Sequence, residues 1–230
     1  MHFSLHAVVP APDTLFKNIK KVPPGCYLTI DENKKIAIIQ YWKLESPERK
    51  NIITNENEAT EIIEYLLKKS IEKRLSASDI DVGVLLSGGL DSSMIVALAK
   101  EKFPKLKTYS IGFEDDKEEK GNEFIYSDQV AKKYKTDHKK FIIDNTLVLS
   151  KLPKAFEAMS EPMVAQDAVA FYMLSELVRK DVKVILSGQG ADEGFAGYFW
   201  YNKINLEKND YNNFLKHYVD RNEDELNEFL

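Results

Sequence analysis

The sequence predicts an α/β fold, a twisted parallel sheet with helices on both faces and a small β extension at the N-terminus. Three observations carry this prediction. From residue 58 onward, apolar runs of strand length alternate with longer runs of helical periodicity. The expected strands are mostly apolar along their length, as in strands buried on both faces. Strands that alternate with helices indicate crossover connections and therefore a parallel sheet.

Four strands are expected in this sheet, at residues 82–86, 106–113, 138–143 and 182–186. Five helices are expected beside them, at residues 58–75, 94–100, 123–134, 145–159 and 167–180. In the first helix, acidic residues lie near the N-terminal end and basic residues near the C-terminal end, which is favourable for the helix dipole. We expect Pro153 to interrupt the fourth helix, because proline removes an intrahelical hydrogen bond. The acidic segment 114–121 is expected to be a loop.

The chain is expected to divide into an extension over 1–45, a polar linker over 46–57 and a main domain over 58–230. Within the extension, residues 26–31 and 35–41 have the pattern of a β-hairpin with a polar turn. The extension is too short for a core of its own, so we expect it to pack on the main domain. Cys26 lies in strand-like sequence with no histidine nearby, which favours a buried or half-buried thiol over a nucleophile.

Composition excludes several classes of protein. The chain has 230 residues and is 43% hydrophobic, enough for a full core. A net charge of −5 gives no basic surface for nucleic acid. The single cysteine excludes an internal disulfide framework and fits a reducing compartment. No apolar run reaches membrane-spanning length and no signal peptide is recognisable, so we expect a cytoplasmic protein without a membrane partner.

The loop from Ser87 to Ser93 follows the first strand and precedes a helix. Its sequence is Ser-Gly-Gly-Leu-Asp-Ser-Ser. Glycine lets backbone amides approach a ligand closely, three serine hydroxyls add donors, and a helix N-terminus attracts anions. The pattern is neither a Walker loop nor Gly-x-Gly-x-x-Gly. It indicates a site for pyrophosphate; the alternative is a plain Gly-Ser turn.

The loop from Ser187 to Gly194 follows the fourth strand in the same way. Parallel strands end at one edge of the sheet, where open α/β sheets bind ligands. The two loops would bring Asp91, Asp192 and Glu193 to this edge. Carboxylates that face a triphosphate indicate Mg²⁺, which takes one or two carboxylates together with phosphate oxygens. The alternative is that Asp192 and Glu193 cap the next segment.

Both loops resemble signatures of one family. Ser87 to Ser93 resembles the pyrophosphate loop of the ATP pyrophosphatases. Residues 184–198 resemble the second signature of the asparagine synthetase family. Further segments that fit this family are Arg74-Leu75, Ser110-Ile111-Gly112-Phe113, Glu123 with Tyr126, His138, and Glu161-Pro162 with Asp167. Residues 9–16 and 22–25 and the pair Tyr41-Trp42 resemble the end of the family's glutaminase domain.

The resemblance implies an adenine nucleotide alpha hydrolase-like fold and an ATP-dependent ligase. In this family, ATP adenylates the β-carboxylate of aspartate with release of pyrophosphate, and ammonia then displaces AMP to give asparagine. His2 stands where the family's glutaminase needs cysteine, so glutaminase activity is not expected. Partners would be small molecules and either a separate glutaminase subunit or further copies of the chain. The chain ends earlier than family synthetase domains, as a short homologue or an excised fragment would.

The resemblance also assigns roles to residues. Adenosine would contact Leu86 and Ile111. Pyrophosphate would be held by Ser87, Gly88, Gly89, Asp91 and Ser92. The nucleotide would also face Ser187 and Gly188, and Mg²⁺ would bind Asp91 and Asp192. Gln189 would lie beside the acyl-adenylate, where a neutral amide can donate to an oxygen. Asp167 and Glu193 would belong to the substrate pocket, whereas His138 is expected to be structural rather than a base.

Two other functions stay open. A related carboxylate adenylase would close a β-lactam or a peptide ring, and the sequence does not separate these substrates from aspartate. A nucleotide-binding module without catalysis would bind ATP but release no pyrophosphate.

Overall fold

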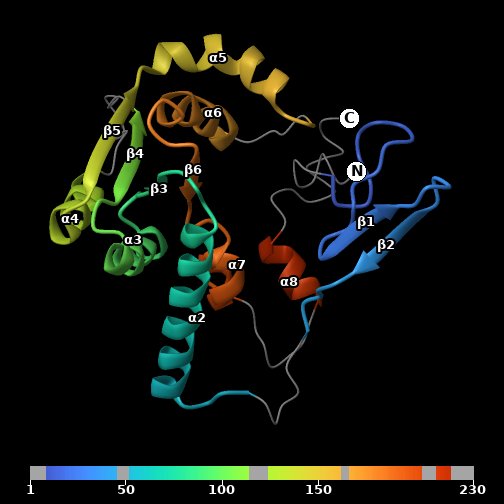
Figure 1. The fold of residues 1–230 in the computed structure, drawn as a ribbon, viewed down its shortest axis with the longest axis horizontal. Coiled ribbons are helices and arrows are strands. Elements are labelled where there is room, and N and C mark those ends of the chain that lie inside the picture. The colour runs from blue at the N-terminus through green and yellow to red at the C-terminus, as the bar shows by residue number, and fades with distance from the viewer. Residues whose placement is uncertain (1–8, 46–51, 114–123, 162–165, 204–210, 219–230) are drawn as a thin grey trace. The chain divides into compact units, whose positions relative to one another are not determined.

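The computed structural model describes residues 9–45, 52–113, 124–161, 166–203 and 211–218 (Figure 1). The chain divides into two compact units. The larger comprises 53–157 and 166–201, and the smaller comprises 1–52, 158–165 and 202–230. The contiguous domain boundaries expected from the sequence stay a prediction.

The larger unit is built on a four-stranded sheet in the order β5-β4-β3-β6. Its strands are β3 (Val82–Leu85), β4 (Lys107–Phe113), β5 (Asp137–Ile143) and β6 (Val184–Leu186). All three neighbouring pairs are parallel. In the register, Val84 lies opposite Leu186, and Leu85 lies opposite Tyr109. The predicted parallel sheet is therefore confirmed, and β3 and β6 are neighbours although a hundred residues separate them.

Helices cover both faces of this sheet, as predicted. They are α2 (Glu56–Ser76), α3 (Leu90–Lys102), α4 (Phe124–Tyr134), α5 (Asn145–Ala158), α6 (Gln166–Val178) and the short α7 (Ala191–Phe195). On one face, Val84 of β3 packs in a buried cluster with residues of α2, α3 and α4. On the other face, Tyr109 packs with Leu174 and Val178 of α6. The two clusters place the core on either side of β3 and β4.

Element boundaries differ from the predicted ones where local capping decides them. Helix α2 begins two residues early, because the Asn55 side chain accepts a hydrogen bond from the Glu58 amide at 3.0 Å. Helix α5 continues through Pro153, so the predicted interruption is wrong. Proline removes one intrahelical bond there, while Ala155 beyond it is buried and anchors the next turn. The predicted loop over 114–121 lies outside the described residues.

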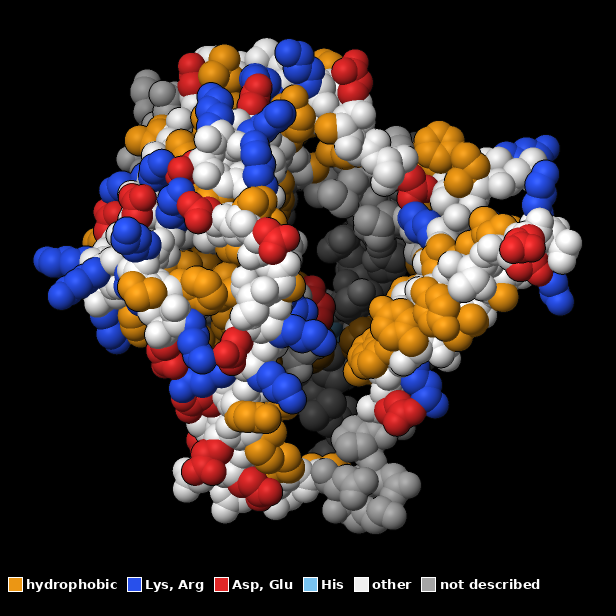
Figure 2. All heavy atoms as spheres, in the orientation of Figure 1, with side chains coloured by type: hydrophobic (Ala, Val, Ile, Leu, Met, Phe, Trp, Pro, Cys, Tyr) orange, Lys and Arg blue, Asp and Glu red, His pale blue; other side chains and the backbone are white. Residues whose placement is uncertain are grey.

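The smaller unit contains the predicted hairpin. Strands β1 (Cys26–Ile30) and β2 (Ile36–Gln40) pair antiparallel, and Cys26 is half-buried as expected. Many apolar side chains of the hairpin are exposed on the face drawn in Figure 2. The unit also holds α8 (Tyr211–Tyr218), and the boundary between the two units falls within the 3₁₀ helix η2 (Phe199–Lys203). Across the described ranges, no helix is long and apolar enough to cross a membrane.

Glu161 joins two segments of the smaller unit. Its carboxylate accepts a hydrogen bond from the Leu15 amide at 2.8 Å and forms an ion pair with Lys21. These contacts lower the pKa of Glu161, with the Lys21 hydrogen bond as the largest cause. Glu161 therefore connects the segment after α5 to the N-terminal extension.

Candidate functional site

The two Ser-Gly loops meet at the carboxyl edge of the sheet. Because β3 and β6 are parallel neighbours, the loops that follow them leave the sheet side by side. A Cβ on Gly188 would lie 2.9 Å from Asp91 Cβ and 3.1 Å from the Ser92 amide nitrogen. The second loop therefore lies directly against the first turn of α3, and only glycine permits that approach. The predicted convergence of the two loops is confirmed.

The first loop is preformed by hydrogen bonds of its own. The hydroxyls of Ser87 and Ser92 lie 3.0 Å apart, and Ser87 Oγ accepts from the Gly89 amide at 3.2 Å. Gly88 adopts a φ of 95°, and a Cβ there would lie 2.4 Å from Tyr126 Cβ. The loop therefore needs glycine for its conformation and for its packing against α4.

One predicted donor of this loop is turned inward. Ser93 Oγ is buried and has no hydrogen-bond partner among the residues the structure describes. Its neighbour Ser92 lines the pocket described next, whereas Ser93 is absent from that lining. Ser87 and Ser92 are thus the hydroxyls of the loop that a ligand would meet.

A pocket of about 310 Å³, here called the edge pocket, lies where the loops meet. The first loop contributes Ser87, Gly89, Asp91 and Ser92, and the second contributes Ser187, Gly188, Gln189 and Asp192. Apolar walls come from Leu85, Tyr109, Ile111, Phe171 and Leu174. Polar loops at one end and apolar walls at the other suit a ligand with an anionic tail and an apolar body. Most of the predicted site residues are thus brought together.

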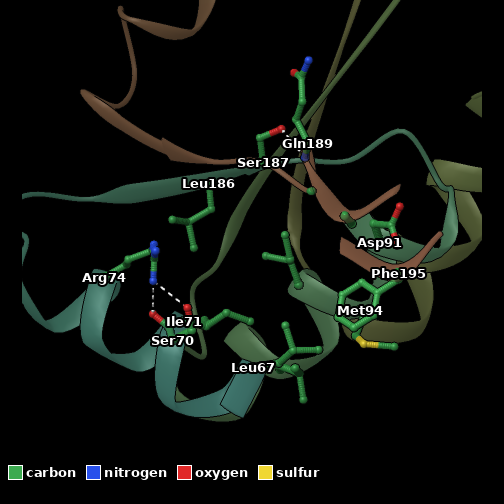
Figure 3. Close-up of a pocket in the computed structure, with 14 residues that line it drawn as sticks. Leu67, Ser70, Ile71, Arg74, Asp91, Met94, Leu186, Ser187, Gln189 and Phe195 are labelled. Atoms are coloured by element: carbon green, nitrogen blue, oxygen red, sulfur yellow. Dashed lines mark hydrogen bonds between the residues drawn. The ribbon is translucent and has the colours of Figure 1, made fainter. Parts of the chain in front are cut away.

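A second pocket of about 260 Å³, here called the flank pocket, shares Asp91, Ser187, Gly188 and Gln189 with the first. Figure 3 shows its apolar floor and the Gln189 side chain, which points away from that floor. Arg74 lines this pocket from α2, and its Nη1 donates to the carbonyl oxygen and the hydroxyl of Ser70 at 3.0 and 2.5 Å. The second loop therefore separates two cavities rather than closing one.

The acidic residues of the second loop are placed differently from each other. Asp192 lines the edge pocket, with one carboxylate oxygen packed against Gly197. Glu193 accepts a hydrogen bond from the Tyr198 hydroxyl at 2.7 Å, which lowers the pKa of Glu193 and raises the pKa of Tyr198 to about 12. Asp167 lies in the first turn of α6, but its side chain is outside the described residues. Asp91 and Asp192 are the two carboxylates that the edge pocket gathers.

These two carboxylates fit Mg²⁺, which takes one or two from a protein when phosphates and water supply the remaining oxygens. Within the described ranges, no group of three or more His, Cys, Asp or Glu side chains is placed to hold a metal ion. Asp91 and Asp192 line the same cavity as the loop glycines and hydroxyls. Their donor set suits a cation that is shared with a bound phosphate chain.

Leu86 offers less to a ligand than its predicted role suggests. Its side chain is 1% exposed, and its amide donates to the Tyr109 carbonyl at 2.8 Å. Its own carbonyl accepts a hydrogen bond from the Ser110 hydroxyl. Sequence reasoning did not assign Ser110 or Phe171 to the site. Ser110 lies within the expected strand over 106–113, beside Ile111, which was assigned to the nucleotide.

The opposite, amino edge of the sheet carries a cluster that was not predicted. The Asp181 carboxylate accepts hydrogen bonds from Tyr109 at 2.6 Å, Lys139 at 2.6 Å and Lys107 at 3.2 Å. These donors, Lys139 first, hold the pKa of Asp181 far below its usual value. Burial, and then the hydrogen bond to Asp181, raises the pKa of Tyr109. Asp181, which precedes β6, is therefore linked to the beginnings of β4 and β5 by hydrogen bonds and ion pairs with Lys107 and Lys139.

The chain is similar to known proteins in structure and in sequence. An NH3-dependent NAD synthetase from Campylobacter jejuni superposes with a TM-score of 0.42 at 15% identity over 60% of each chain. Glutamine-hydrolyzing asparagine synthetase 1 of Bacillus subtilis is 34% identical over 193 residues, which are 84% of this chain and 29% of that protein. A putative glutamine-hydrolyzing asparagine synthetase of Mycobacterium tuberculosis is 31% identical over 217 residues, 91% of this chain and 32% of that protein.

The chain thus spans about a third of the length of the curated relatives it matches. The family model for asparagine synthase matches residues 63–228, a range that includes both Ser-Gly loops. That range is well over half of the 230 residues. The chain therefore belongs to the asparagine synthase family.

Proposed function

We propose that the chain is an ATP-dependent, AMP-forming ligase that converts aspartate and ammonia to asparagine. The observation that carries the proposal is the meeting of the two loops around one pocket that holds both Asp91 and Asp192. Membership of the asparagine synthase family supports ATP-dependent amidation as the reaction class.

In this proposal the first loop holds the pyrophosphate end of ATP. Ser87, Gly89 and Ser92 line the edge pocket beside the N-terminus of α3. A helix N-terminus attracts negative charge, and glycine allows the backbone to approach phosphate closely. Asp91 and Asp192 would hold Mg²⁺, which would neutralise charge on the phosphates when bound.

Two bond exchanges then complete the reaction. An oxygen of the aspartate β-carboxylate attacks the α-phosphorus, and the bond to pyrophosphate breaks. Ammonia next attacks the acyl carbon, loses a proton, and the bond to AMP breaks. Both steps depend chiefly on positioning and charge stabilisation, so the chain needs no nucleophilic side chain.

The second loop would hold the reacting centre. Ser187 and Gly188 would face the α-phosphate, and the Gln189 amide would donate to a phosphate or carboxylate oxygen. We also propose that Asp167 and Glu193 shape the acyl pocket, and that the adenosine contacts Leu86 and Ile111. Ammonia, not glutamine, would be the direct nitrogen source. In the cytoplasm this ammonia would be free in solution or would come from a separate glutaminase subunit. The other assembly that we propose is self-association of the chain.

The test is pyrophosphate release by the full chain with ATP, Mg²⁺, aspartate and ammonia, with AMP and asparagine measured in the same samples. Omission of aspartate or Mg²⁺ should abolish pyrophosphate release. Omission of ammonia should stop asparagine formation. If ATP binds but no carboxylate yields pyrophosphate, the chain is a nucleotide-binding module. Release with another carboxylate but not with aspartate would replace the proposed substrate.

A further inference from the structure

Two aromatic side chains line the edge pocket, and they differ in how much of their surface is free. Tyr109 is 1% exposed, and its ring stacks on Phe141 of β5 with 6.3 Å between the centroids and 4° between the planes. Phe171 of α6 is 41% exposed and, within the described ranges, stacks on no other ring. Of the two aromatic side chains, Phe171 is therefore the one whose ring a ligand can cover.

The position of Phe171 follows from the direction of α6. The helix ends at Val178, a few residues before β6 begins, so it runs toward the amino edge of the sheet and starts at the carboxyl edge. Leu174 and Val178 lie on the same helix face as Phe171, and both are 5% exposed in the cluster around Tyr109. Phe171 lies one turn before Leu174, and there the apolar face of α6 leaves the cluster and lines the pocket.

The other apolar side chains of the pocket offer less surface to a ligand. Leu85 and Ile111 are half-buried, and Leu174 is buried. Leu86, which the proposed function places against adenosine, has a side chain that is 1% exposed. Phe171 is therefore the most exposed of the apolar residues that line the edge pocket.

The polar loops decide which part of a nucleotide could reach this ring. Ser87, Gly89 and Ser92 line the pocket beside the N-terminus of α3, which attracts phosphate. With the phosphate chain on these loops, the base is the part of ATP that would extend toward the apolar walls. Nucleobases stack on aromatic side chains through their π-faces, and such stacking needs no hydrogen bond to the edge of the base.

We propose that Phe171 is a base-binding residue, on whose ring the nucleobase of the bound triphosphate stacks. The inference rests on the proposed ATP site and adds to it a contact that the sequence does not predict. The ring contributes to the affinity for the nucleotide and takes no part in the two bond exchanges. Phosphate binding at the loops does not depend on it.

The test compares equilibrium binding of ATP and of inorganic tripolyphosphate to the full chain, with Mg²⁺ and without an acyl substrate. Tripolyphosphate has a chain of three phosphates but no base. We expect Phe171→Ala to weaken ATP binding by about tenfold, as is usual when one stacked base loses its aromatic partner. Tripolyphosphate binding should stay within about twofold of wild type. Phe171→Tyr keeps the ring and should bind ATP about as tightly as wild type.

Phe156→Ala is the matched control, because Phe156 is also an exposed phenylalanine on a helix but does not line the edge pocket. Both affinities should stay at their wild-type values in this variant. Thermal unfolding shows whether Phe171→Ala folds. If it does not, Phe171→Leu and Phe171→Tyr carry the same test, since leucine keeps apolar bulk but has no ring, and the leucine variant should bind ATP several-fold more weakly.

The outcomes separate this inference from the ATP site. Failure of the wild-type protein to bind ATP would overturn the ATP site itself, whether or not tripolyphosphate binds. Equal ATP affinities in wild type and Phe171→Ala would overturn the role of the ring and leave the site in place. An equal loss of affinity for both ligands would also overturn it, because the ring would then support the loops rather than the base.

Discussion

The two edges of the sheet are built from the same four strands but use their polar groups in different ways. At the amino edge, Asp181 takes hydrogen bonds from Tyr109, Lys107 and Lys139, and Lys107 also pairs with Asp81. At the carboxyl edge, two Ser-Gly loops surround a pocket that carries hydroxyls and carboxylates. One edge satisfies its charges internally, and the other presents them to a cavity.

This difference separates stability from ligand binding. Charges that already pair within the chain stabilise the fold and have little left for a ligand. Groups that line a cavity contribute little to packing but interact with whatever enters. Changes at the carboxyl edge should therefore alter binding and turnover, and changes at the amino edge should alter unfolding.

The largest effect is expected from Asp91→Asn. The exchange keeps the size of the side chain and removes the charge that would face Mg²⁺. Because a bound metal contributes several kcal/mol to such reactions, turnover should fall about 100-fold or more. Pyrophosphate release measures it. Asp79→Asn, at an exposed acid before β3, is the matched control and should match wild type. Wild-type turnover in Asp91→Asn would remove the metal role.

A smaller loss, of ATP affinity, is expected from Gly188→Ala. The new Cβ would lie 2.9 Å from Asp91 Cβ and would push the two loops apart. A displacement of this size at a phosphate site should weaken ATP binding by about tenfold, with little change in unfolding. Gly194→Ala is the control, since a Cβ there meets nothing within 4 Å. Equal ATP affinities for the two variants would contradict the loop contact.

Asp181→Asn tests the amino edge. The variant loses the charge that three donors share, so its melting temperature should fall by about 4 °C, while ATP affinity stays within about twofold of wild type. Thermal unfolding and ATP titration together measure both. Asp137→Asn is the control, because this exposed acid stands on the same edge without a side-chain partner among the described residues. A loss of ATP binding in Asp181→Asn would break the separation of the two edges.

The contrast between the edges also explains what the sequence predicts and what it misses. Both loops are contiguous motifs that follow apolar strands, so the parallel sheet alone brings them to one edge. The Asp181 cluster is different, because its partners lie 42 to 74 residues away and no local pattern connects them. Phe171 enters the edge pocket through the packing of α6 on the sheet, which periodicity does not predict.

Element boundaries follow the same logic. Asn55 decides where α2 begins through one side-chain hydrogen bond, and Gly89 is the residue before the first turn of α3. A side-chain cap such as that of Asn55 shifts a helix end by about two residues without any change in hydrophobic pattern. Pro153 shows the reverse case, since the helix continues through it to the buried Ala155 in spite of a strong local signal against it.

The smallest predicted effect concerns His138, which lies between the two edges. Its pKa is lowered by burial, so the unfolded chain takes up a proton near pH 6.5 while the folded chain stays neutral. Stability should therefore fall as the pH drops below about 6.5, by at most about 1.4 kcal/mol per pH unit.

The amino edge depends on pH in a lower range. Because the pKa of Asp181 is lowered, the stability that Asp181 contributes is lost only below about pH 4, so it does not interfere with the His138 measurement. Urea unfolding of wild type and His138→Phe between pH 7.5 and 5.0 should show a slope in wild type that the variant lacks. Parallel curves would mean that another group, and not the His138 ring, takes up the proton.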